Sequence, residues 1–77
     1  MKNVEIFGTG CKKCIKLEEN CLIAKKNTNS DCIIKHIYDL EEIANRGVFQ
    51  TPSLMIDGKI IVTGKVLKVK KLEELLK

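Results

Sequence analysis

The stretch that decides the fold is Val4-Glu5-Ile6-Phe7-Gly8-Thr9-Gly10-Cys11-Lys12-Lys13-Cys14. Its first part is nearly continuously apolar, so we predict a short buried strand over residues 2–7. The two glycines then interrupt the strand. From Cys11 to about Ala24 the chain has no Gly or Pro, and apolar residues recur at helical spacing. A strand therefore leads directly into an amphipathic helix that begins at or beside Cys11.

Residues 25–47 predict a loop, a strand and a short helix. The polar residues 25–31 read as the loop, and the β-branched residues of 32–38 as a strand with the polar content of a sheet edge. Asp39 and Glu42 have the spacing of a capping box, so we expect a helix to begin there. That helix ends near residue 46, with Gly47 in the position that commonly follows a helix.

The last third of the chain predicts a hairpin and a helix. Strands over 53–56 and 59–62 flank Asp57-Gly58, which is a strong hairpin signal. An apolar stripe over 69–76 indicates a final helix whose start is poorly capped. The order β-α-β-α-β-β-α places the first two strands parallel and adds an antiparallel hairpin. We therefore predict an α/β fold with a four-stranded mixed sheet and helices on both faces.

The cysteine pair at the start of the first helix has the pattern of a redox site. Unpaired N–H groups and a partial positive charge at a helix N-terminus stabilise a thiolate. Lys12 and Lys13 add positive charge to the same turn. We expect Cys11, at the exposed helix end, to attack a disulfide, and Cys14, one turn inward, to resolve the mixed disulfide. A C-x-x-C pair between a strand and a helix thus predicts thiol–disulfide exchange.

The other cysteines and the one histidine have simpler interpretations. Cys21 lies two turns beyond Cys14 on the apolar stripe, so we expect Cys21 and Cys32 to be buried small hydrophobes. We expect His36 on the surface of an edge strand and not as a ligand. A structural zinc site usually has two close cysteine pairs, whereas only the first pair is close here. Metal capture by that pair stays open as an alternative.

Composition limits the partners and the location of the 77-residue chain. Lys and Arg number 14 against 10 Asp and Glu, and the excess is spread along the chain without interleaved aromatic residues. We therefore expect no nucleic-acid partner. No apolar run approaches the roughly 20 residues of a membrane helix, and the N-terminus lacks a secretory pattern. We expect no membrane contact, a cytoplasmic location and, at 8.7 kDa, a monomer.

Residues 4–14 resemble the active-site segment of thioredoxin-like proteins, and residues 47–58 resemble their later segment with a cis-proline and a hairpin. The likeness is greatest to small prokaryotic glutaredoxin-like thioredoxins, often called redox-active disulfide proteins, and covers nearly the whole chain. It implies one thioredoxin-like domain over residues 1–77. The implied redox centre is the Cys11–Cys14 disulfide itself, without a cofactor or metal, and the implied electron donor is a disulfide reductase.

The same resemblance implies a cis peptide bond before Pro52, beside the cysteines. The proline would shield the cysteines from metals, and the backbone of Thr51 would pair with an extended substrate peptide. Residues 62–66 lack the Asp that completes the glutathione-binding motif of glutaredoxins, so we expect a protein disulfide and not glutathione as substrate. Thioredoxins proper have a Trp before the pair and Gly-Pro within it, whereas this chain has no Trp.

Glu5 lies six residues before Cys11, the spacing of a buried acid in thioredoxins. A carboxylate there would accept a proton from Cys14 during resolution. The alternative is that Glu5 points into solvent at a strand end, and the sequence leaves both open.

Two other functions stay open. A soft-metal carrier for copper or zinc would also place a C-x-x-C after its first strand. Such carriers have the order β-α-β-β-α-β and usually a Met where this chain has Thr9, and both features argue against that function. A non-catalytic thioredoxin-like interaction module would keep the fold alone, although the intact cysteine pair and Thr51-Pro52 argue against it.

Overall fold

The computed structural model describes residues 2–76. Its elements are β1 (Asn3–Phe7), α1 (Lys12–Thr28), β2 (Ile33–Ile37), α2 (Leu40–Asn45), β3 (Ser53–Ile56), β4 (Lys59–Thr63) and α3 (Val69–Leu76). This is the predicted order β-α-β-α-β-β-α. It differs from the order of the soft-metal carriers, because a helix separates the second strand from the third.

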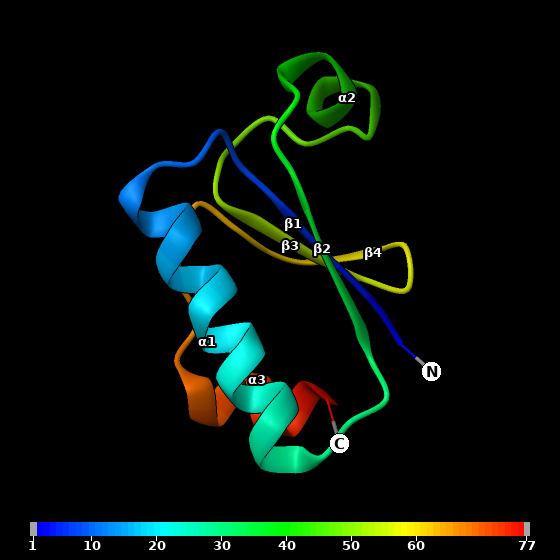
Figure 1. The fold of residues 1–77 in the computed structure, drawn as a ribbon. Coiled ribbons are helices and arrows are strands. Elements are labelled where there is room, and N and C mark those ends of the chain that lie inside the picture. The colour runs from blue at the N-terminus through cyan, green and yellow to red at the C-terminus, as the bar shows by residue number, and fades with distance from the viewer. Residues whose placement is uncertain (1, 77) are drawn as a thin grey trace.

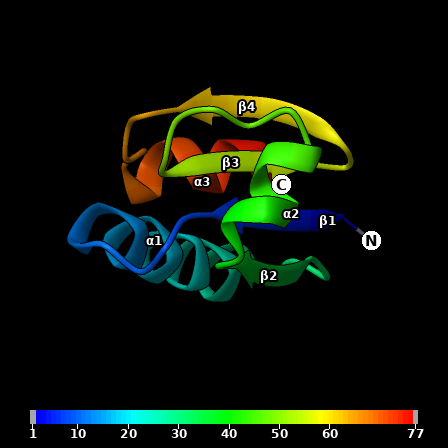
Figure 2. The same ribbon diagram turned by 90° about the horizontal axis from the view of Figure 1, so that it is seen from above.

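The four strands form one mixed sheet in the order β2-β1-β3-β4. β1 runs parallel to β2 and antiparallel to β3, and β4 completes the hairpin with β3. Figure 2 shows the strands side by side, with α2 in front of the sheet and α1 and α3 behind it. The predicted α/β class with helices on both faces is therefore confirmed, and β2 is an edge strand as expected.

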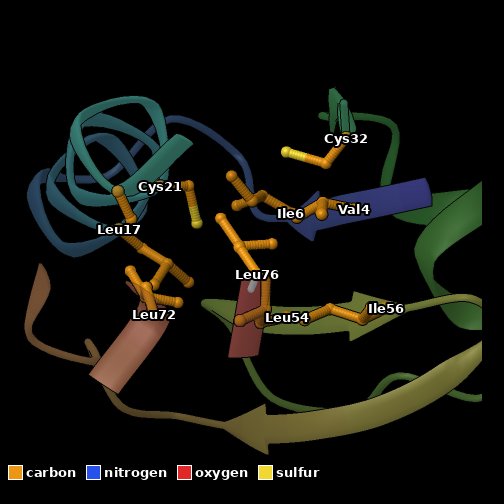
Figure 3. Close-up of a cluster of buried hydrophobic side chains, with 10 residues drawn as sticks. Val4, Ile6, Leu17, Cys21, Cys32, Leu54, Ile56, Leu72 and Leu76 are labelled. Atoms are coloured by element: carbon orange, nitrogen blue, oxygen red, sulfur yellow. The ribbon is translucent and has the colours of Figure 1, made fainter. Parts of the chain in front are cut away.

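The larger core lies between the sheet and the layer formed by α1 and α3, which pack together (Figure 1). Figure 3 shows side chains from both helices meeting those of β1 and β3; the buried members are Val4, Ile6, Leu17, Cys21, Ala24, Cys32, Leu54, Ile56, Leu72 and Leu76. Full burial of one large apolar side chain contributes about 1.5–3 kcal/mol, so this cluster is the main source of stability.

A smaller core lies on the other face of the sheet, beneath α2. It consists of Phe7, Ile43, Val48 and Met55. Because side chains alternate along a strand, β1 sends Val4 and Ile6 towards α1 and sends Glu5 and Phe7 towards α2. This alternation decides where Glu5 lies.

α1 is one turn longer than predicted. The residues expected to begin a loop at 25 continue the helix to Thr28, because Lys25 and Lys26 are good helix formers and suit the negative end of the helix dipole. Asn29 ends the helix in the left-handed conformation, with φ of 52°. No helix within residues 2–76 has both the length and the apolar character needed to cross a membrane.

The helix cap and the hairpin turn predicted from the sequence are both present in the structure. Asp39 is the N-cap of α2, and its Oδ1 accepts a hydrogen bond of 3.0 Å from the Glu41 backbone N–H. The hairpin turns at Asp57 and Gly58, which both have positive φ, as a two-residue turn of the primed type requires.

Candidate functional site

The two segments singled out from the sequence meet at one end of the sheet. Phe7, the last residue of β1, is paired with Ser53, the first residue of β3. The loop from Gly8 into α1 and the segment before β3 therefore leave the sheet side by side, as Figures 1 and 2 both show. The peptide bond between Thr51 and Pro52 is cis.

The two cysteines of the first helix lie close together at its start. Cys11 is the N-cap of α1 and is exposed, with extended backbone, whereas the Cys14 side chain is fully buried. Their Sγ atoms are 2.7 Å apart, and either can donate its S–H to the other. A disulfide bond is about 2.05 Å long, so the two sulfur atoms need to move only a short distance towards each other to form one.

The two thiols have opposite pKa shifts. The pKa of Cys11 is lowered, chiefly because the Cys14 thiol hydrogen-bonds to its sulfur and also because backbone N–H groups at the helix start, including that of Lys13, point at it. Burial raises the pKa of Cys14, and donation of its hydrogen to Cys11 raises it further. Cys11 is thus the more readily ionised, accessible sulfur, and Cys14 is the protected one.

Lys12 and Lys13 occupy the exposed first turn of α1, which contains no acidic residue. Two positive charges near the N-terminal end of the helix favour an anion at the N-cap, where Cys11 lies. Both lysines are therefore in the position expected for stabilising the Cys11 thiolate.

Gly8 is the residue that lets Cys14 lie against β1. A Cβ atom at Gly8 would be 2.2 Å from the Cys14 Sγ and 2.9 Å from its Cβ, far closer than non-bonded atoms pack. The sequence indicates Gly8 only as a strand breaker, but its lack of a side chain provides the space for the buried sulfur.

Thr51 is exposed and Pro52 is buried beside it. The Pro52 carbonyl accepts a 2.7 Å hydrogen bond from the Gly64 N–H, which ties this segment to the end of β4. Phe49, two residues before Thr51, is 88% exposed. An exposed residue with an exposed aromatic side chain two positions before it is suited to contact with a peptide.

The structure does not place Glu5 beside Cys14. Glu5 points to the face covered by α2, whereas Cys14 belongs to α1 on the opposite face. The Glu5 carboxylate accepts two hydrogen bonds, of 3.1 and 2.7 Å, from the Arg46 guanidinium at the end of α2. The hypothesis of a proton acceptor at Glu5 is therefore corrected to an ion pair. The solvated alternative holds only in part, because the Glu5 side chain is 14% exposed and its contact with Arg46 lies at the surface.

His36 is inside the protein and not on its surface. Its side chain is 4% exposed and lies between Glu18 of α1 and the Gly8 carbonyl. The sequence prediction was wrong because it read the edge strand as open to solvent, although α1 covers this face of β2. Strand alternation with the buried Cys32 was the signal for His36, and the four-residue spacing from Cys14 was the signal for Glu18.

Cys21 and Cys32 are buried in the larger core, as predicted. Burial raises the pKa of Cys21 to about 12, and the nearby Cys32 and Glu18 act in the same direction. A thiol with this pKa is protonated and unreactive at neutral pH. Within residues 2–76, no three His, Cys, Asp or Glu side chains cluster as a metal site would require.

Known proteins similar to this chain share one description. The family described as thioredoxin domain matches residues 2–77. A curated thioredoxin of Methanothermobacter thermautotrophicus is 30% identical over 76 residues, which cover 99% of each chain. A curated thioredoxin of Methanocaldococcus jannaschii is 39% identical over 74 residues, which cover 96% of this chain and 85% of that protein.

Proposed function

The chain belongs to the thioredoxin family, and on that premise we propose that it is an oxidoreductase that reduces protein disulfides through Cys11 and Cys14. The observation that carries the proposal is the geometry of the pair. The two sulfurs are 2.7 Å apart, one exposed with a lowered pKa and one buried with a raised pKa. Disulfide exchange needs this division between an attacking and a resolving thiol.

The proposed reaction has two steps. The Cys11 thiolate attacks one sulfur of the substrate disulfide, whose S–S bond breaks, and the departing sulfur takes up a proton. Cys14 then loses its proton and attacks Cys11, the bond between Cys11 and the substrate breaks, and the second substrate sulfur leaves as a thiolate. Two electrons pass from the dithiol to the substrate, and a disulfide reductase returns them. The pair itself carries the electrons, so the reaction needs no cofactor.

An extended protein segment is the substrate that suits the surroundings of the pair. Thr51 is exposed, and its backbone would hydrogen-bond with such a segment as an added strand does. The exposed ring of Phe49 offers apolar contact area next to it. Lys12 and Lys13 favour acidic residues near the substrate disulfide. Cytoplasmic location stays a prediction from the sequence.

The experiment is a redox titration of the reduced chain, with metal analysis of the same anaerobic sample. We expect a reversible two-electron transition in the wild type and in Cys21→Ala, the matched loss of a thiol outside the pair. Cys11→Ser and Cys14→Ser should abolish it. A potential near about −270 mV would indicate a reductant, and one above about −180 mV an oxidant.

Two outcomes would contradict the proposal. Stoichiometric Cu(I) or Zn(II) on Cys11 and Cys14, with no disulfide formed, would support the metal carrier. A folded chain that neither forms and breaks the disulfide reversibly nor binds metal would support the non-catalytic interaction module.

A further inference from the structure

Behind the cysteine pair lie a histidine and a glutamate that the exchange reaction does not use. The His36 Nδ1 is 2.5 Å from the Glu18 Oε1, and its Nε2 is 3.2 Å from the Gly8 carbonyl oxygen. The Tyr38 ring stacks on the imidazole, with centroids 3.9 Å apart and planes 4° from parallel. The imidazole is therefore held on three sides and covered from solvent.

The hydrogen-bond partners of His36 decide its chemical form. A carboxylate oxygen and a backbone carbonyl oxygen are both hydrogen-bond acceptors, so both contacts are hydrogen bonds when each ring nitrogen presents an N–H. A neutral imidazole has one N–H, whereas an imidazolium has two. Only the imidazolium form can therefore donate to both of these acceptors at once.

The His36 Nε2 and the Cys14 sulfur both lie near Gly8. The point at which Gly8 would carry a Cβ is 2.2 Å from the Cys14 Sγ and 3.8 Å from the His36 Nε2. Since Gly8 has no side chain, none separates the sulfur from the ring there. Glu18 binds the other nitrogen, so the negative charge lies at the far side of the ring.

The titratable groups near His36 come from α1 and from the segments at the ends of α1 and β2. α1 supplies Glu18 and Cys14, Cys11 is its N-cap, and Tyr38 directly follows β2. On this face β1 supplies the uncharged Ile6, which is paired with His36, and the Gly8 carbonyl follows the end of β1. Because side chains alternate along a strand, Lys35 lies on the face of the sheet opposite to His36. Lys12 and Lys13 are exposed on the first turn of α1.

We propose that His36, fixed by Glu18, is a positioning residue whose charge stabilises the thiolate of Cys14 while it resolves the mixed disulfide. The inference rests on the proposed exchange reaction. In that step Cys14 gives its proton to water, and its thiolate bonds to the Cys11 sulfur. The bond from Cys11 to the substrate breaks, and the substrate thiolate leaves with the electron pair. A fixed cation favours the anionic reactant, which burial alone disfavours.

The test uses one equivalent of 5,5′-dithiobis(2-nitrobenzoate), which releases one coloured thiolate at each of the two steps. We expect His36→Gln to leave the first phase unchanged and to slow the second about tenfold at pH 7. The midpoint of the second phase against pH should rise by about one unit, the equivalent of that factor. Glu18→Gln should shift the midpoint in the same direction by less. Lys35→Gln, the same loss of charge on the opposite face, is the matched control and should change neither phase.

The outcomes separate this inference from the proposed function. A wild type that gives no second phase would overturn the exchange reaction, and the inference with it. If the wild type gives both phases while His36→Gln and Glu18→Gln, each folded, keep the same second-phase rate and pH midpoint, the inference alone is overturned. Thermal unfolding of each variant establishes that it is folded. Should His36→Gln not fold, Glu18→Gln decides the matter alone, because Glu18 is 32% exposed and its replacement keeps the shape.

Discussion

Replacement of Gly8 by Ala would test the close packing that holds Cys14 in place. The new Cβ would be 2.2 Å from the Cys14 Sγ, whereas ordinary contact begins at 3.4 Å, so the sulfur must move by about an ångström. Gly8 does not have a positive φ, so the effect is steric and not conformational. Insertion of a methyl group into a packed core costs about 1–3 kcal/mol, and this overlap belongs at the upper end. For a domain of this size we expect the melting temperature to fall by about 10–20 °C.

A double-mutant cycle identifies the cause. Cys14→Ala removes the sulfur and leaves the milder 2.9 Å contact between the two Cβ atoms. Gly8→Ala should therefore destabilise the Cys14→Ala protein by about 1 kcal/mol, with a coupling energy of about 1–2 kcal/mol between the positions. The assay is urea unfolding of the reduced proteins followed by circular dichroism.

Equal destabilisation by Gly8→Ala in both backgrounds would refute this reasoning, because the Cys14 sulfur would not be the obstacle. A nearly neutral effect in the wild type would refute it more directly, since the loop would then accommodate a side chain without moving Cys14.

Two further predictions concern the other ionisable groups. Glu5→Gln should leave the pH profile of disulfide reduction unchanged and lower the unfolding free energy by about 0.2–1 kcal/mol, because Arg46 is 40% exposed and its ion pair is screened by solvent; a shifted pH profile would return Glu5 to the mechanism. Stability of the reduced protein should fall as pH rises from about 8.5, where an unfolded thiol ionises, towards about 12, because burial raises the pKa of Cys21 in the folded state and the unfolded chain loses that proton first. Unfolding by urea between pH 8 and pH 10.5 measures this slope, and an equally steep slope in Cys21→Ala would contradict the assignment.

The sequence by itself determined the elements and brought out the candidate cysteine pair. The hairpin at Asp57-Gly58, the cap at Asp39 and the helix that begins beside Cys11 depend on backbone preferences and on periodicity, which act between residues close in the chain. The burial of Cys21 followed from its position on the apolar stripe of one helix. The end of α1 was missed because polar residues suit a helix end and a loop equally, and the choice depended on the left-handed conformation of Asn29.

Only the tertiary structure decided the surroundings of Cys14. Glu18 and His36 are 18 residues apart and Glu5 and Arg46 are 41 apart, so no local pattern reveals that either pair meets. His36 lies near Cys14 because its side chain points to the face of the sheet that α1 covers. Glu5 lies on the opposite face, which α2 covers. The physical reason is that a charge is stabilised by groups within a few ångströms of it, and packing brings those groups from distant parts of the chain.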